Sequence, residues 1–254
     1  MKKVLLIAFA LLLTITLFGC NAKETAQGID DDFIYVGNTA ATSGVFAGVG
    51  VPFNLAMQVV FDKYNASNTG RDIKFIHYDD GFDGEVGLAL TKKLVEEDKV
   101  FALVGHFGTN TVNATMDYLL ESGIPMIYGV TGVNSLFFEG VPGNNILSVQ
   151  PIYRTEGRMM LSRALHESLF GPNGDQKLGA NDKIVVLYSN DDAGNSMKLG
   201  IEDEVAARNI ASRVTYLPFS AEDATSVIPT ALAQNPGVIL LPANQAPATA
   251  AAIA

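Results

Sequence analysis

Residues 101–128 read FALVGHFGTNTVNATMDYLLESGIPMIY, and they carry the clearest signal of the chain's architecture. An apolar run at 101–104 precedes a loop rich in glycine, threonine and asparagine, and a helical pattern follows at 109–121. A second apolar run stands at 124–128, directly after that helix. Two short β-type runs joined by one helix predict a βαβ unit, whose two strands lie parallel in one sheet.

The same alternation continues on both sides of this unit. We expect further strands at 33–37, 73–78, 146–149, 183–188, 213–217 and 238–241. We expect further helices at 51–64, 85–97, 154–170, 193–208 and 221–234. This order predicts an α/β fold with mostly parallel sheets. Because an irregular segment at 132–143 interrupts the alternation, we expect two Rossmann-like lobes, the first at 33–149 and the second, incomplete, at 150–254.

The N-terminus has the pattern of an export signal. Lys2 and Lys3 precede an apolar run at 4–18, and Cys20, the only cysteine of the chain, follows it. A basic start, an apolar centre and a small residue before the cleavage point are typical of a secretory signal peptide. The apolar run is shorter than the roughly 20 residues that a transmembrane helix needs. We therefore expect an exported protein.

Cys20 indicates how the exported protein is attached to the membrane. Residues 17–20, LFGC, resemble a bacterial lipobox, a signal in which the cysteine receives lipid and becomes the mature N-terminus. The resemblance implies a lipoprotein signal peptide at 1–20, lipidation of Cys20 and a location at the cell membrane, facing outward. The alternative is an ordinary signal peptide with an incidental cysteine. The small polar residues at 21–32 are typical of a flexible tether between an anchor and a folded body.

The composition predicts a folded protein and excludes one class of partner. Its 254 residues are 48% hydrophobic and 17% charged, which is enough apolar material for a sizeable core and too little charge for a disordered protein. The formal net charge is −10. A surface of this sign repels nucleic acid, so we expect no nucleic-acid partner.

The residues that most often perform catalysis are scattered in this sequence. None of the three histidines has a second histidine or a cysteine at metal-ligand spacing, and none accompanies a recognisable nucleophile motif. We expect these histidines to have structural or surface roles; they are His77, His106 and His166. The pattern predicts no catalytic residues, no metal and no cofactor. An exported hydrolase or nucleotide enzyme is the alternative, which detectable turnover would support.

Asp79, Asp80 and Asp83 resemble the start of a calcium-binding loop. The match fails because Leu90 stands at the twelfth position, where such a loop has a glutamate. We expect the three carboxylates to cap a turn and the helix that follows it.

Three loops after expected strands are rich in small hydroxyl and amide residues. They lie at 39–44, which contains Ser43, at 105–111 and at 129–132. In an open α/β sheet, ligands bind outside the carboxyl ends of the strands. The second loop leads directly into a helix, whose free N–H groups and dipole favour a carboxylate, and Thr109 and Asn110 can add side-chain donors. Simple N-capping by the same residue types is the alternative.

Several motifs resemble the substrate-binding proteins of branched-chain amino-acid ABC transporters, the leucine-binding type. The order and spacing agree best between Ile34 and Gly132, and more loosely through the second half. The matching segments are 43–50, 78–80, 92–95, 104–106, 123–127, 183–188 and 192–194. The resemblance implies the type I periplasmic binding fold, in which two lobes close on a small ligand and then dock on a membrane permease.

The resemblance also implies roles for individual residues. A hydroxyl residue in the loop that matches 108–110 binds the ligand's α-carboxylate, which points to Thr109. A backbone carbonyl and a threonine match Val130 and Thr131. Asp192 is a candidate partner for an ammonium group, although a surface turn residue is its alternative role.

The chain also departs from the family pattern. Val49, Ala193 and the loop at 242–245 stand where the family often has aromatic residues, so the usual side-chain pocket and leucine specificity are not predicted. The alanine-rich segment 246–254 predicts a helix. Family members run roughly 100 residues longer, so we expect a C-terminally truncated chain with exposed sheet edges and weak ligand binding by residues 1–254 alone.

The leading interpretation is an exported lipoprotein that captures an amino acid or a related small molecule for an ABC importer. A ligand-binding module of a sensory receptor with the same fold is the alternative. The lipobox favours transport, because a sensor usually keeps a membrane-spanning helix. Adjacent genes for a permease and an ATPase would favour transport, whereas an adjacent kinase gene would favour sensing.

Overall fold

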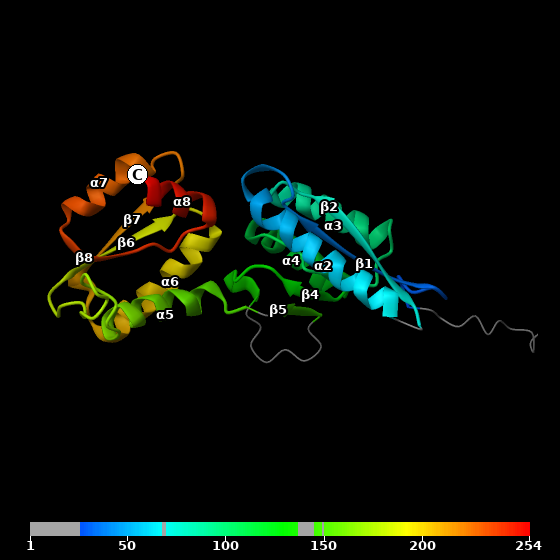
Figure 1. The fold of residues 1–254 in the computed structure, drawn as a ribbon, viewed down its shortest axis with the longest axis horizontal. Coiled ribbons are helices and arrows are strands. Elements are labelled where there is room, and N and C mark those ends of the chain that lie inside the picture. Colours follow the sequence, from blue (N-terminus) through cyan, green and yellow to red (C-terminus); the bar gives the residue numbers. More distant parts are fainter. Residues whose placement is uncertain (1–25, 68–69, 137–144, 149) are drawn as a thin grey trace, which may run out of the picture.

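The computed structural model describes residues 26–67, 70–136, 145–148 and 150–254. The expected signal peptide, Cys20 and the first part of the expected tether lie outside the described residues. The described chain forms two parallel sheets with their helices, joined by the segment around residue 150 (Figure 1). We call the part with the first sheet the first lobe and the part with the second sheet the second lobe.

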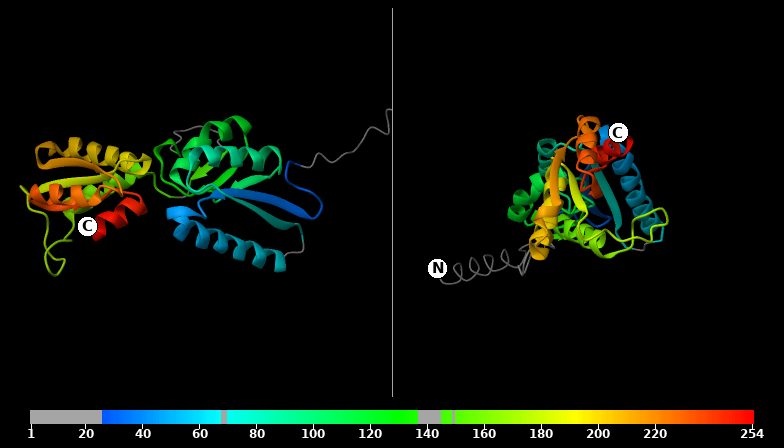
Figure 2. Two further views of the ribbon diagram at one scale, coloured as in Figure 1. Left: turned by 90° about the horizontal axis from the view of Figure 1, so that it is seen from above. Right: turned by 90° about the vertical axis from the view of Figure 1, so that its left-hand side faces the viewer.

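The first lobe contains a five-stranded parallel sheet in the order β2-β1-β3-β4-β5. Its strands are β1 (Phe33–Ala40), β2 (Asp72–Asp79), β3 (Ala102–Val104), β4 (Met126–Gly129) and β5 (Ile146–Ser148). Its helices are α2 (Ala47–Ser67), α3 (Gly84–Glu96) and α4 (Thr109–Ser122), with short 3-10 turns η1 (Gly44–Phe46) and η2 (Asn134–Leu136). Helix α2 covers one face of the sheet, and α3 and α4 pack together on the other (Figure 2). The core of the lobe lies between the sheet and this helix pair.

The second lobe contains a three-stranded parallel sheet in the order β7-β6-β8. Its strands are β6 (Lys183–Ser189), β7 (Val214–Phe219) and β8 (Pro236–Leu240). Its helices are α5 (Tyr153–His166), α6 (Asp192–Arg208), α7 (Ala224–Ala233) and α8 (Gln245–Ile253), with one 3-10 turn, η3 (Ala211–Arg213). Helices α5 and α6 cover one face of the sheet, and α7 and α8 cover the other (Figure 1).

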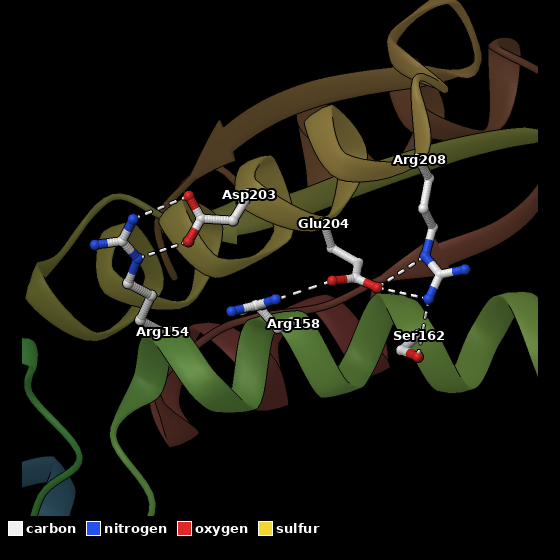
Figure 3. Close-up of polar contacts among 6 residues, drawn as sticks. All are labelled: Arg154, Arg158, Ser162, Asp203, Glu204 and Arg208. Carbon is white, nitrogen blue, oxygen red and sulfur yellow. Dashed lines mark hydrogen bonds and ion pairs between the residues drawn. The ribbon is translucent and has the colours of Figure 1, made fainter.

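Helices α5 and α6 lie in close contact because each has a glycine at the crossing. A Cβ atom at Gly157 would overlap the carbonyl oxygen of Met197, and one at Gly200 would overlap that of Arg154. Ion pairs flank the crossing. The guanidinium of Arg154 binds both carboxylate oxygens of Asp203, at 2.7 and 2.9 Å (Figure 3).

A second set of polar contacts centres on Glu204, a carboxylate that is 9% exposed. It lies 2.8 Å from Nε of Arg208 and 3.6 Å from Nε of Arg158, and Arg208 also reaches the hydroxyl of Ser162 (Figure 3). A buried carboxylate needs such partners, because an unpaired charge away from water is strongly unfavourable.

The α/β class and the two-lobed parallel architecture are confirmed, and so is the order of strands and helices. Strand β1 extends three residues beyond the expected end, because its pairing with β2 continues to Ala40, opposite Asp79. The amide of the buried Asn38 in this extension donates to Asn54 and to the carbonyl of Gly105. Helix α2 begins at Ala47 rather than at 51. Gly50 belongs to the helix because it packs against the carbonyl of Ala41, where a side chain would not fit.

The expected helix at 154–170 was too long. Helix α5 ends at His166, and Glu167 is already extended. Phe170 pairs with Gln176 in an antiparallel bridge around Gly171, whose φ is 79°. This local pairing removes 167–170 from the helix.

Helix α2 has an unusually apolar outer surface. Together with the preceding η1 turn, it is long and apolar enough, by length and composition, to cross a membrane, with a mean hydropathy of 1.6. Leu55, Val59 and Val60 are each about 60% exposed on it. The helix nevertheless packs along β2 of the first sheet, so length and composition alone do not assign it to a membrane.

Candidate binding cleft

Each sheet has a topological switch point at the strand that comes first in its sequence. Strand β1 lies between β2 and β3, and β6 lies between β7 and β8. Connections leave such a strand toward opposite sides of the sheet, which opens a crevice at its carboxyl end. The η1 turn after β1 contacts α8 of the second lobe, and the carboxyl ends of β1 and β6 each face the other lobe (Figure 1).

A cluster of three hydroxyl groups, two from the first lobe and one from the start of α5 in the second, lies at the crevice of the first lobe. The hydroxyl oxygens of Thr109 and Thr131 are 2.9 Å apart, and the Tyr153 hydroxyl lies 3.3 Å from the first and 3.4 Å from the second. Thr109 and Thr131 are almost completely buried. Each hydroxyl can both donate and accept, so the cluster can rearrange its protons to meet a ligand oxygen.

The N-terminus of α4 adds backbone donors to this cluster. The helix begins at Thr109, and its N-cap residue is Gly108, which has no side chain to cap the first turn. The first N–H groups of a helix have no partner within it, and they carry the positive end of the helix dipole. Donors and dipole together therefore favour a carboxylate beside Thr109.

Two adjacent cavities occupy the space between the lobes. The first, about 220 Å³, is lined by Phe46, Val49, Phe82, Phe107, Gly108, Thr109, Val130, Gln150, Tyr153 and Asn244. The second, about 320 Å³, is lined by Val45, Phe46, Phe82, Asn110, Ser189, Asn190, Asp191, Phe219, Ser220, Ala221, Glu222, Asn244 and Pro247. Both lobes contribute to both cavities, so ligand-sized space lies between them.

The three expected capping aspartates hold the loops of the first lobe in place. Oδ1 of Asp83 accepts the N–H groups of Glu85 and Val86 and caps α3, as expected. Asp79 accepts the N–H groups at 42, 43 and 81. Burial opposes the ionisation of Asp79, but the hydrogen bond from the Ser43 side chain and these three backbone hydrogen bonds outweigh it and lower its pKa to about 2. Across the part of the chain that the structure describes, no three histidine, cysteine or acidic side chains gather to hold a metal ion.

Three of the six expected ligand-binding residues line the cavities, and a fourth lies directly behind one of them. Thr109 and Val130 line the first cavity and Asn110 lines the second. Thr131 stands behind Thr109 and holds it by the hydrogen bond described above. The carbonyl of Val130 accepts the N–H of Gly108 at 3.4 Å.

The other two residues lie elsewhere. Ser43 is exposed, and its N–H group is bound by Asp79, 3.2 Å away. Asp192 is exposed on the first turn of α6 and accepts a hydrogen bond of 3.3 Å from Asn113 on α4. Asn113 in turn accepts from the hydroxyl of Ser135. Asp192 thus joins the two lobes and is not among the residues that line either cavity.

Sequence analysis missed the aromatic residues of the cleft. Tyr153 was included in no motif, because it follows an irregular segment and starts a helix. Phe46 and Phe82 fall between the expected strands and helices, where a single aromatic residue gives no periodic signal. A phenylalanine directly after Asp-Asp-Gly, in a turn that faces the strand-end loops, was the available hint.

Two α/β lobes with a cavity between their strand-end loops define a two-lobed ligand-binding protein. The chain belongs to the periplasmic binding protein family, whose profile matches residues 34–254. A search of the curated proteins finds no matching sequence.

Solved structures of similar fold include three ABC transporter proteins. The fatty acid ABC transporter substrate-binding protein from Thermomonospora curvata has a TM-score of 0.75 and 19% identity over 90% of this chain and 56% of its own. The solute-binding protein from R. palustris in complex with benzoate has a TM-score of 0.67 and 18% identity, over 85% of this chain and 57% of its own. The branched-chain amino-acid transporter substrate-binding protein from Streptococcus pneumoniae, in complex with isoleucine, has a TM-score of 0.65 and 19% identity, over 83% of this chain and 57% of its own. The chain therefore spans less than two thirds of the length of each.

Proposed function

We propose that this protein captures an amino acid or a related small molecule outside the cytoplasm for an ABC importer, without chemical change of the ligand. The observation that carries the proposal is the hydroxyl cluster at the uncapped N-terminus of α4, open to a cavity between two lobes. The solute-binding proteins of similar fold support capture rather than catalysis.

Thr109 would hold the ligand's carboxylate together with the first N–H groups of α4. The carbonyl of Val130 has a second lone pair, which can accept an ammonium proton. Asn110 would add an amide from the neighbouring cavity. Closure of the second lobe would complete the site and present the protein to a permease.

Thr109→Ala is expected to weaken ligand binding by about 1–3 kcal/mol, because it removes one hydrogen bond from a buried charge. A thermal-shift screen of the full-length protein against amino acids, amides and small carboxylates would first find the ligand, and calorimetry would then measure the variant. Thr109→Ser, which keeps the hydroxyl, should retain most of the affinity. Thr115→Ala is the control for folding, since the Thr115 hydroxyl donates to the carbonyl of Val112 within the same helix. Unchanged affinity in Thr109→Ala would remove Thr109 from the site.

We also propose that Cys20 carries the lipid anchor. In cells that express the full-length protein, Cys20→Ala is expected to move it from the membrane fraction to the soluble fraction. Mass spectrometry of the wild-type N-terminus should find a lipid-modified cysteine. A mature N-terminus at another residue, or an unmodified Cys20, would contradict the anchor and leave the ordinary signal peptide.

A further inference from the structure

Two phenylalanine rings form the wall that the two cavities share. Phe46 comes from the η1 turn after β1, and Phe82 comes from the turn after β2. Their ring centroids are 3.9 Å apart, and the ring planes differ by 23°, so the rings are stacked. Both side chains are half-buried, and both line each cavity. A ligand that extends from one cavity into the other must therefore pass along this pair.

The position of Phe82 is held by an unusual backbone. Its φ is 70°, in the left-handed region, which is unfavourable for a bulky side chain and is found mainly where surrounding contacts impose it. The buried Asp80 imposes it here. Oδ1 of Asp80 accepts the N–H of Phe82, and Oδ2 accepts the hydroxyl of Thr111 on α4, each at 2.9 Å.

This arrangement aims the ring of Phe82 at the start of α4. A Cβ atom at Gly108 would lie only 3.0 Å from two ring carbons of Phe82, so the ring can cover this position because residue 108 is a glycine. The aromatic pair thus stands directly beside the backbone donors at Thr109. A ligand whose carboxylate binds there has its next atoms against aromatic faces.

The charges around the cavities favour a ligand that also carries a positive group. Among the described residues that line the cavities, the charged side chains are the carboxylates Asp191 and Glu222, both from the second lobe, and none is a lysine or an arginine. The positive end of α4 can offset one carboxylate of the ligand. Asp191 already accepts hydrogen bonds from Ser189, Gly194 and Asn244. The two carboxylates nevertheless keep a negative charge beside the cavity, and that charge favours a ligand with an ammonium group.

We propose that the ligand is an aromatic amino acid, whose ring packs along Phe46 and Phe82 while its carboxylate binds at the N-terminus of α4. The inference rests on the proposed capture of a small molecule in this cleft. Aromatic rings gain from offset or edge contact with one another beyond what their apolar area supplies. Phe46 and Phe82 are then the residues that select the ligand's side chain.

The test is calorimetry of the full-length protein with phenylalanine, isoleucine and benzoate as probes. We expect phenylalanine to bind at least tenfold more tightly than either of the others. Phe46→Leu should weaken phenylalanine binding roughly three- to tenfold, with less than a twofold change for isoleucine. Phe46→Tyr, which keeps the ring, should retain the preference. Phe33→Leu is the matched control, because Phe33 is a half-buried phenylalanine at the opposite end of β1.

The possible outcomes separate this inference from the proposed function. Isoleucine or benzoate binding as tightly as phenylalanine would overturn the aromatic ligand and leave capture in the cleft intact. If Phe46→Leu lost affinity for phenylalanine and for isoleucine equally, the aromatic ligand would likewise be overturned and capture in the cleft would stand. If Phe46→Leu does not fold, the inference is tested by the relative affinities of the wild type and of Phe46→Tyr for phenylalanine, isoleucine and benzoate. If neither these probes nor any compound of the wider screen bound, the proposed function itself would fail.

Discussion

Gly157→Ala is expected to destabilise the second lobe by about 3 kcal/mol. A single methyl group at this position would overlap the backbone carbonyl of Met197 on α6, and a backbone atom cannot move aside as a flexible side chain can. Helices α5 and α6 would have to separate. Separation would also strain the bidentate pair between Arg154 and Asp203 beside the crossing (Figure 3). The free energy of unfolding, measured by urea denaturation of the full-length protein, checks this prediction.

Gly48→Ala is the matched control. Gly48 lies in helix α2, and no atom approaches the place of its missing Cβ within 4 Å. Alanine is a better helix former than glycine by up to about 1 kcal/mol, so this variant should be slightly more stable than the wild type. Equal stability of the two alanine variants would show that α5 and α6 do not cross as closely as described.

His106 should make the first lobe sensitive to acid. Its ring is completely buried at the end of β3, and burial lowers its pKa to about 4. Nδ1 accepts the N–H of Thr39 at 3.3 Å, so the neutral ring carries its proton on Nε2, which faces the hydroxyl of Thr91 at 3.1 Å. The histidine is therefore structural, as its isolated place in the sequence indicated.

The sign of the pH effect follows from the lowered pKa of His106. An unfolded histidine has a pKa of about 6.5, so below that pH the unfolded chain binds a proton that the folded chain excludes. The free energy of unfolding should fall by about 3 kcal/mol as the pH drops from about 6.5 to 4. Urea denaturation across this range measures the fall.

His106→Gln identifies the source of this pH dependence. The variant should be less stable than the wild type at pH 7, because it loses the acceptor for Thr39, but its stability should change much less between pH 6.5 and 4. Thr91→Ser, which keeps a hydroxyl beside the ring of His106, should show the same change of unfolding free energy with pH as the wild type. Identical slopes in the wild type and His106→Gln would assign the acid sensitivity to other groups.

The local elements of this protein were predictable because each depends on residues close together in the chain. The apolar runs and helical spacing at 101–128 correspond to β3, α4 and β4. Thr109 was identifiable as a candidate binding residue because it follows a glycine at the junction of a strand and a helix. The misplaced helix ends at Ala47 and His166 depended instead on contacts with other segments, at Ala41 and Gln176.

The sequence by itself determined the alternation of strands and helices, the two parallel-sheet lobes and the hydroxyl-rich loops at their strand ends. These properties follow from local periodicity and from the conformational preferences of neighbouring residues. Only the tertiary structure decided that Thr109, Thr131 and Tyr153 meet, that Phe46 stacks on Phe82, and that Asp192 bonds across to the other lobe. The strand order places segments that are distant in sequence beside one another, and no local pattern records which side chains then come into contact.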